Sequence, residues 1–430
     1  MEEYFQTRER YVKHLWFRYE GIVYRGNGVL TWNPDKGFHI IAGIKGNKVP
    51  GKKEFHSIQF NEPTRIRMEM GDGTIAITPL LRFSELGLYW SETFSINIGQ
   101  LILVKNLNNP EKLSEKWGGS AIYEADARLL FPDIVRQETT VGEVGPLESY
   151  SRAGFDYDGN NGEKIWGEVK DNKYIYFSWS FPKQNWTKNQ AFRFADGLRY
   201  ALSALSGETV QLRYHEAERD HRIAKVFNSN EKPILFGLIL RLFDQDIIDK
   251  NSTIQLAYFF AQENEQSKIC KRIYHQIEAA VNQDSQQATE LLLSTTLEAA
   301  LRSIYHLPFA PGRSIRSDPF KLPNALKQFC SDYLTSNPND YREWKKIIDK
   351  VSQAYSRLRH RNAHPDWLYA KSGMFSEKEM EQTVNDMILL SRFYGYMILG
   401  LAGFQNIQPV FPAPMSNWKP YMTFESKTAQ

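Results

Sequence analysis

The stretch TKNQAFRFADGLRYALSALSG, residues 187–207, decides how the chain is organised, because the spacing of its apolar residues differs from everything before it. These residues recur at helical spacing: Ala191, Phe192, Phe194, Ala195, Leu198, Ala201, Leu202 and Leu205. Gly207 follows the last of them and is typical of a helix C-terminus. The stretch predicts a helix near 187–206.

The residues before this helix have the period of strands. Short alternating or aromatic segments are separated by turn residues such as Asn33-Pro34-Asp35-Lys36-Gly37, where proline presets φ and glycine accepts positive φ. The expected strands are 21–24, 28–32, 38–44, 55–60, 64–70, 74–79, 94–104, 120–130, 164–169 and 174–180, with a returning strand at 209–214. Their spacing favours a mainly antiparallel sandwich or barrel. No Gly-rich phosphate loop follows a strand, so a nucleotide-binding Rossmann or P-loop fold has little support.

The residues from 234 onward have a helical period. The expected helices are 234–249, 254–281, 286–305, 324–335, 340–362 and 377–404. The fold class expected is therefore α+β with two domains. Residues 1–228 form a β-rich domain with one helix near 187–206, residues 229–405 form an all-α bundle, and residues 406–430 form a Pro-rich tail.

Composition limits the classes of function. The 53 Lys and Arg residues nearly balance the 50 Asp and Glu residues, for a formal charge of +3, so any nucleic-acid site must be local. Cys270 and Cys330 leave no disulfide framework and no thiolate zinc cluster. The N-terminus MEEYFQTRER lacks the apolar stretch of a signal peptide. We expect a cytoplasmic protein with no cofactor, no metal and no membrane span; the apolar run 387–404 contains Arg392 and is expected to be a buried helix.

The stretch SRLRHRNAHP, residues 356–365, concentrates three arginines and two histidines at one expected helix end. Pro365 disfavours α geometry at His364, so the helix should end there and leave the imidazole at an exposed terminus. An unperturbed histidine titrates near about 6.5 and can act as base or acid near neutrality.

A histidine and an arginine about one turn apart, without a carboxylate or thiolate metal cage nearby, fit the cleavage of an RNA phosphodiester. The 2′-hydroxyl is an internal nucleophile, so the protein only has to move protons with histidine and stabilise phosphoryl charge with arginine. The planar guanidinium matches phosphate geometry and stays charged at any relevant pH.

Arg359-His360-Arg361-Asn362-Ala363-His364 resembles the R-x4-6-H motif of the HEPN superfamily, in which a polar residue follows the arginine. The resemblance implies an all-α HEPN-like bundle, and many such proteins are metal-independent endoribonucleases that dimerise so that two motifs form one cleft. It implies that Arg359 and His364 are catalytic and that His360 takes the polar position. Arg357 satisfies the longer spacing, so the choice between the two arginines stays open.

Two further stretches resemble the ApeA-like branch of this superfamily. Residues 291–305 carry Glu298, an acidic site candidate whose alternative is a surface residue or a helix ion pair. Residues 21–44 are similar to the β-rich domain that precedes HEPN in that branch. The resemblance implies prokaryotic anti-phage defence by abortive infection, with tRNA or another host RNA as substrate. It also implies a homodimer through the C-terminal bundle and a phage-derived protein as trigger at the β domain.

Other residues are candidates for RNA or phosphate contacts: Arg357, Arg361 and Asn362 beside the motif, and Arg313 and Arg316 in the loop 307–323. Their alternative is a solvated helix end or connector. The charged stretch 215–222 could supply metal ligands, but a solvated segment is the preferred interpretation. Residues 156–162 lack the Gly and Glu of a calcium loop and predict a hairpin turn.

The competing hypothesis for the whole chain is a catalytically silent protein. In that case a β-sandwich recognises a ligand or protein, an all-α bundle dimerises, and Arg359 and His364 form a surface ion cluster. A third interpretation, a carbohydrate-binding module, rests only on the tryptophans of the β half.

Overall fold

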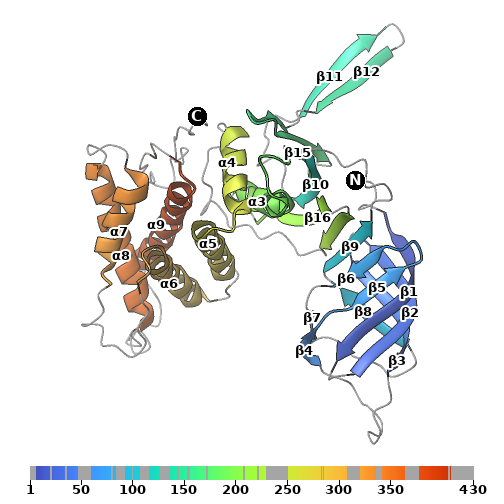
Figure 1. Cartoon of the computed structure of the whole chain (residues 1–430). Helices are drawn as coiled ribbons and strands as arrows, with labels where there is room; N and C mark the ends of the chain where they lie inside the picture. The colour runs from blue at the N-terminus through green and yellow to red at the C-terminus, as the bar shows by residue number, and fades with distance from the viewer. Residues whose placement is uncertain are drawn as a thin grey trace, which may run out of the picture. The chain divides into compact units, whose positions relative to one another are not determined.

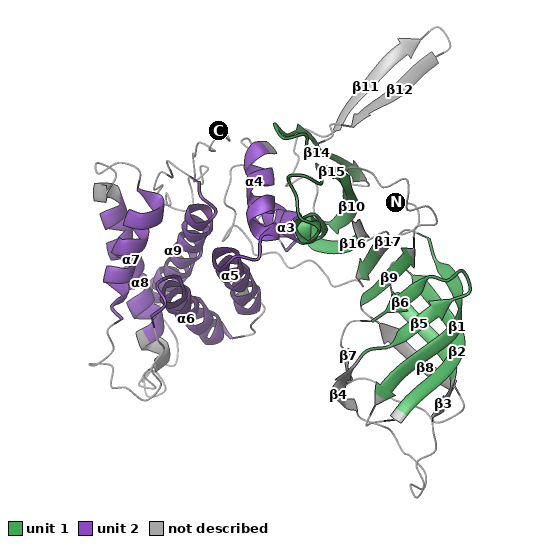
Figure 2. Ribbon diagram, in the orientation of Figure 1, with its two compact units in different colours: residues 1–124, 136–195, 211–232 green, residues 125–135, 196–210, 233–430 purple. Residues whose placement is uncertain are grey.

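The computed structural model is a mixed α+β protein with a large antiparallel sheet and a set of helices (Figure 1). It describes residues 6–19, 22–33, 36–46, 60–78, 81–83, 93–98, 100–106, 116–125, 135–142, 145–152, 155–170, 173–206, 209–219, 222–228, 250–281, 283, 285–307, 320–335, 341–363, 377–404 and 407. The chain divides into two compact units, coloured in Figure 2. Unit 1 comprises residues 1–124, 136–195 and 211–232, and unit 2 comprises 125–135, 196–210 and 233–430.

Unit 1 contains the large sheet. Its strands are β1 (Arg8–Tyr19), β2 (Ile22–Asn33), β3 (Gly37–Gly46), β5 (Arg67–Met70), β6 (Ile75–Ile77), β8 (Thr93–Ile98), β9 (Gln100–Asn106), β10 (Lys116–Glu124), β13 (Phe155–Asp158), β14 (Lys164–Lys170), β15 (Tyr174–Pro182), β16 (Gln211–Arg219) and β17 (Arg222–Asn228). In the described residues these thirteen strands are ordered β13-β14-β15-β10-β16-β17-β9-β6-β5-β1-β2-β3-β8. Two separate strand pairs are β4 (Phe60–Thr64) with β7 (Leu81–Phe83), and β11 (Val135–Gly142) with β12 (Gly145–Arg152).

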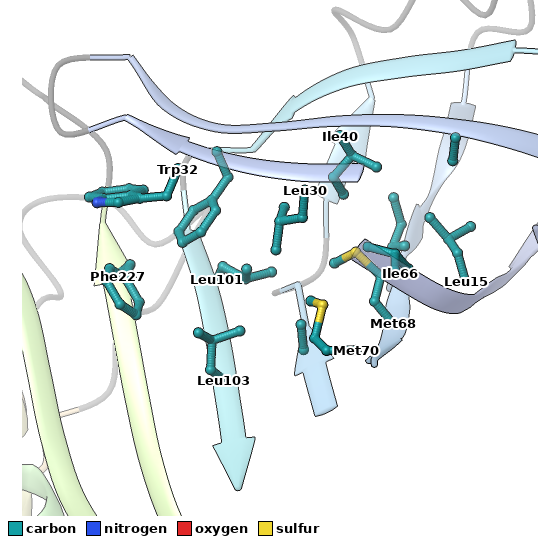
Figure 3. Packing of buried hydrophobic residues seen from close by; sticks show 14 of the residues in the cluster. Leu15, Leu30, Trp32, Ile40, Ile66, Met68, Met70, Leu101, Leu103 and Phe227 are labelled. Atoms are coloured by element: carbon teal, nitrogen blue, oxygen red, sulfur yellow. The ribbon is translucent and has the colours of Figure 1, made fainter. Parts of the chain in front are cut away.

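One hydrophobic core is formed mainly by the strands from β9 to β8 in this order, and Ile122 of β10, Tyr214 of β16 and Phe227 of β17 join it (Figure 3). Leu30, Ile40 and Met68 alternate with exposed or half-buried neighbours, so each strand places one apolar face inward. The rings of Trp32 and Phe227 meet edge-on with centroids 5.1 Å apart. Burial of such side chains is worth about 1.5–3 kcal/mol each, which is the main source of stability here.

Strands β10 and β15, in the other part of the sheet, pack against α3 (Lys188–Ser206). Phe194 of this helix contacts Trp179 of β15, with ring centroids 5.4 Å apart, and the Tyr123 hydroxyl donates to the carbonyl of Ala195 at 2.7 Å. Thr187 and Gln190 exchange hydrogen bonds at the start of α3, which is a capping-box arrangement. The helix predicted near 187–206 is confirmed.

Unit 2 contains the remaining described helices. These are α4 (Lys250–Ala261), α5 (Glu265–Val281), α6 (Gln286–Ile304), α7 (Leu322–Phe329) with a π-helical turn (Cys330–Leu334), α8 (Tyr341–Ala363) and α9 (Glu377–Leu401). Within the described residues, no helix combines the length and the apolar composition needed to cross a membrane. The helices predicted at 286–305, 324–335, 340–362 and 377–404 are confirmed, with small differences at the ends.

The helix α8 packs against α6, α7 and α9 through one buried apolar face. Trp344, Ile348 and Leu358 are fully buried, and the Trp344 ring meets Tyr396 of α9 edge-on at 5.0 Å. Arg357 and Arg359 do not belong to this buried face, because both lie on the exposed side of the same helix. Packing therefore holds the arginine-bearing end of α8 against α6 and α9.

One predicted helix is wrong. Residues 254–281 form two helices, because the Asn264 side chain accepts a hydrogen bond from the backbone N–H of Ser267 at 2.8 Å and caps α5. The Ser267 hydroxyl also donates to the carbonyl of Gln262 at the end of α4. The predicted helix 234–249 and the tail after residue 407 lie outside the described residues.

Several strand predictions also need correction. The predicted strand 94–104 is two strands, since β8 pairs with β3 whereas β9 pairs with β6 and β17. The described residues of the charged stretch 215–222 belong to the β16–β17 hairpin, and His215 is buried, so His215 is not part of a solvated segment. The predicted turns at 33–37 and 156–162 are confirmed, with Gly37 and Gly162 at positive φ.

Candidate functional site

Two of the predicted arginines, Arg357 and Arg359, lie near the end of α8 and their side chains are described. His360, Arg361 and Asn362 belong to the last turn of the same helix, and only their backbone is described. The predicted residues His364, Arg313 and Arg316 lie outside the described residues. The geometry of the candidate site is therefore that of the two arginines and of the side chains they meet.

Arg359 meets the predicted acidic candidate, Glu298. Glu298 lies buried on α6, and its Oε2 atom receives both the Arg359 guanidinium, through Nη1, and the Tyr355 hydroxyl, at 2.8 Å. Its Oε1 atom accepts a hydrogen bond from Nε of Arg302, one turn further along α6, at 2.9 Å. We call these four side chains the Glu298 cluster. The fold thus unites two residues that are 61 positions apart in the chain, 298 and 359.

The Glu298 cluster carries more positive than negative charge. Two guanidinium groups share one carboxylate, and the side chain of Arg302 is only 7% exposed while that of Arg359 is 44% exposed. The Arg302 guanidinium also lies over the ring of Phe320, 4.3 Å from its centroid. Arg359 is the more exposed of the two guanidinium groups, so it is the one that an anion from solvent can reach.

The Tyr355 hydroxyl holds Arg359 in place, and the nearby Tyr394 hydroxyl is poorly suited to proton transfer. The Arg359 guanidinium donates to the Tyr355 hydroxyl and lies over the Tyr355 ring, 5.5 Å from the centroid. Tyr394, whose hydroxyl donates to the carbonyl of Leu293 on α6, is fully buried, and this burial raises its pKa well above the ordinary value. Tyr394 therefore stays neutral near pH 7 and does not act as a base there.

Arg357 has a different partner. Its guanidinium donates two parallel hydrogen bonds to Asp386 of α9, from Nε at 2.7 Å and from Nη2 at 2.6 Å, and Gln382 donates to the same carboxylate at 2.9 Å. The hydrogen bonds to Asp386 raise the pKa of Arg357. Two residues along a helix turn by about 200°, which explains why Arg357 faces α9 while Arg359 faces α6. Arg357 therefore ties two helices together.

Sequence reasoning missed three members of this arrangement: Tyr355, Arg302 and Asp386. A local signal existed for two of them, because Glu298 and Arg302, and likewise Tyr355 and Arg359, are four residues apart and so share a helix face. Asp386 had no such local signal, because it lies on α9 and its partner Arg357 lies on α8.

No relative supplies a function. Neither a protein-family model, nor a curated protein, nor a solved structure matches the chain. In the described residues, no group of three or more His, Cys, Asp or Glu side chains is arranged to hold a metal ion. Of the histidines considered for a metal site, His215 is buried beside the ring of Phe192, 5.2 Å away, and His221 lies outside the described residues.

Proposed function

We propose that this chain is a metal-independent endoribonuclease of the HEPN type, in which Arg359 binds the scissile phosphate and His364 moves the protons. The observation that carries the proposal is the Glu298 cluster: a charged Arg359 is oriented by a buried carboxylate and by Tyr355, yet remains partly exposed. Pre-oriented positive charge at an accessible surface is what stabilisation of a phosphoryl transition state needs. A second support for the proposal is the spacing from Arg359 to His364, which resembles the R-x4-6-H motif.

The proposed reaction uses the 2′-hydroxyl of RNA as nucleophile. His364 accepts the proton of the 2′-hydroxyl as the 2′-oxygen bonds to phosphorus, and the bond from phosphorus to the 5′-oxygen breaks. The leaving 5′-oxygen takes a proton from an imidazolium, supplied by His364 or its copy in the dimer. The products are a 2′,3′-cyclic phosphate and a 5′-hydroxyl. Arg359 binds the non-bridging phosphoryl oxygens, and Glu298 acts as a positioning residue.

The architecture proposed for this function goes further than an α+β description. Unit 2 would be a HEPN-like bundle that forms a homodimer, so that two Arg359/His364 pairs make one cleft. In unit 1, the seven strands in the order β9-β6-β5-β1-β2-β3-β8 would form a barrel-like domain. The first and last strands of this order, β9 and β8, are separated by only one residue in the chain, which would bring the two ends of the order together. This domain would recognise a phage-derived protein in the cytoplasm, and cleavage of tRNA or another host RNA would abort infection.

Chelation is a direct test of the chemistry. Because the proposed mechanism needs only proton transfer and a guanidinium, cleavage of a single-stranded RNA should persist in EDTA at the untreated rate. The cut ends should carry 2′,3′-cyclic phosphates, which sequencing of the fragments with and without end repair detects. Loss of cleavage on chelation, reversed by added Mg²⁺, would reject the metal-free mechanism.

One observation favours the second candidate function, a catalytically silent binding protein. The Arg359 charge is already compensated in part by Glu298, as expected of an ion pair that serves stability. Overexpression separates the two candidates: a nuclease should be toxic through His364 and Arg359, whereas a silent binder should be equally harmless with or without these side chains.

A further inference from the structure

A second concentration of positive charge lies on a neighbouring face of α6, where α5 and α6 lie side by side (Figure 1). The two helices border an open hollow of about 710 Å³. Lys268, Ile269 and Arg272 line it from α5, Ala299 and Arg302 line it from α6, and His306 lines it from just beyond the end of α6. We call this hollow the α5–α6 groove.

The cations of α5 are available to a ligand. The side chains of Lys268 and Arg272 are exposed and one turn apart, about 6 Å along the helix axis, and neither side chain forms a hydrogen bond or ion pair with any residue that the structure describes. The acidic side chain of the lining, Glu265, lies 3.7 Å from Nδ1 of His306. Among the described residues, neither Lys268 nor Arg272 therefore has an ion-pair partner.

His306 holds an unfavourable backbone conformation at the end of this groove. It has φ of 50°, and in the described part of the chain it is the one non-glycine residue at positive φ. The backbone N–H of Leu307 donates to the carbonyl of Arg302 at 2.9 Å, which makes His306 the left-handed residue of a Schellman C-cap. Glycine is preferred at this position, so the chain places an exposed imidazole at the end of the groove at a conformational cost.

Arg302 joins the groove to the candidate site. It lines the α5–α6 groove and also donates to Glu298, whose other oxygen receives Arg359. The groove and Arg359 are thus reached from adjoining faces of α6. A strand of nucleic acid bound in the groove could continue toward Arg359.

We propose that the α5–α6 groove binds the sugar–phosphate backbone of single-stranded RNA and leads it to Arg359. This inference rests on the proposed nuclease function, because it names the surface that holds the same substrate. Among the described residues, the lining contains no Phe, Tyr or Trp on which a base could stack, and its two α5 cations, Lys268 and Arg272, are exposed. Such a surface binds phosphates with little regard to sequence and does not suit a compact nucleotide ligand.

The test measures RNA binding by the full chain with His364→Ala, so that the RNA stays intact. A 5′-fluorescein-labelled single-stranded RNA of mixed sequence is titrated by fluorescence anisotropy over a series of KCl concentrations. The variant Lys268→Gln/Arg272→Gln is compared with the matched control Lys345→Gln/Lys346→Gln, which removes two exposed charges from α8. All four positions are exposed, so both variants should keep the parental melting temperature.

The expected result follows from counterion release. Each phosphate contact on a single strand contributes about 0.7 to the slope of log K against log salt, so losing two contacts lowers the slope by about 1.4. At about 0.15 M salt this corresponds to binding about 14-fold weaker, relative to equal affinity at 1 M. The control should keep the parental slope. The inference is overturned if both variants lose affinity equally, if neither does, or if the parent binds no RNA.

Failure of the groove and failure of the nuclease are distinguishable. If the intact chain cleaves RNA through Arg359 and the groove variant binds and cleaves like the control, the groove assignment alone is wrong. If the groove-dependent slope is found but no condition yields cleavage, RNA binding stands and the proposed nuclease function is wrong.

Discussion

Substitution of Arg357 and of Arg359 by glutamine should give opposite phenotypes, although the two residues are separated by one position on α8. Arg357 donates two hydrogen bonds to Asp386, whose side chain is only 3% exposed, whereas Arg359 is a partly exposed arm of the Glu298 cluster. The first substitution should therefore cost stability and spare cleavage. The second should spare stability and abolish cleavage.

The magnitudes follow from what each substitution leaves behind. Arg357→Gln leaves a buried carboxylate without its cation, a loss of about 3–5 kcal/mol when both partners are buried. Because the Arg357 side chain is 41% exposed, about 2 kcal/mol is the better expectation. For a unit of this size, 1 kcal/mol shifts the melting temperature by about 2–4 °C, so the transition of unit 2 should fall by about 4–8 °C.

Arg359→Gln should cost about 0.5 kcal/mol, or about 1–2 °C. Its side chain is 44% exposed, and Glu298 keeps its hydrogen bonds from Arg302 and Tyr355. Melting temperatures, and not a single unfolding free energy, are the quantities to compare, because the chain has two compact units.

The assay pairs scanning calorimetry with RNA cleavage measured well below either transition. Lys346→Gln, an exposed change on the same helix, is the control and should match the wild type in both. The reasoning is refuted if Arg359→Gln cleaves RNA at the wild-type rate, or if Arg357→Gln abolishes cleavage while melting at the wild-type temperature. The second outcome would make Arg357 the phosphate ligand.

Three further substitutions test the packing around the site by thermal unfolding. Glu298→Gln removes the buried carboxylate that Arg302 and Arg359 share and should lower stability by about 3 kcal/mol; an unchanged melting temperature would mean that the Glu298 cluster does not form. His306→Gly should raise stability by up to about 1 kcal/mol, since the left-handed cost of an L-residue, about 1–2 kcal/mol, exceeds the extra entropy that glycine loses, about 0.5–1 kcal/mol; destabilisation would contradict the C-cap geometry. Gly197→Ala should lower stability by about 1–3 kcal/mol, because the new Cβ would lie 2.3 Å from the carbonyl oxygen of Ala257; a gain would show that α3 and α4 are less closely packed than described.

Apolar periodicity predicted most helices because burial against neighbours selects one face of each. The stretch 187–207 predicted α3, and the helical period at 340–362 predicted α8. The same rule failed at 254–281, where apolar spacing continues across two helices and only the Asn264 cap separates them.

Strand prediction failed where the period of two is broken. A bulge in β1 puts Val12 and Leu15 on the same buried face although they are three residues apart, so β1 escaped detection. Between β8 and β9, Gly99 is the signal that a continuous apolar run changes its partners. Strand pairing is non-local, so an alternating pattern predicts a strand but does not predict which other strand it pairs with.

The candidate site, like the fold, was predicted only in part: its residues could be selected from the sequence, but the contacts between them could not. Motif spacing selected Arg359 and resemblance selected Glu298, while their contact depends on how α6 and α8 are rotated against each other. The pairing of Arg357 with Asp386 likewise joins two helices, and it favours Arg359 between the two arginines that sequence left open. Contacts across helices are set by packing, which single-sequence periodicity does not contain.

The central claim is that Arg359 and His364 cut RNA. The most direct measurement is total-RNA integrity, with sequencing of the cut ends, in cells that express the wild type, Arg359→Ala or His364→Ala at matched levels, with and without phage challenge. We predict that only the wild type fragments RNA and that its fragments end in 2′,3′-cyclic phosphates. Equal RNA integrity in all three under challenge would contradict the nuclease account.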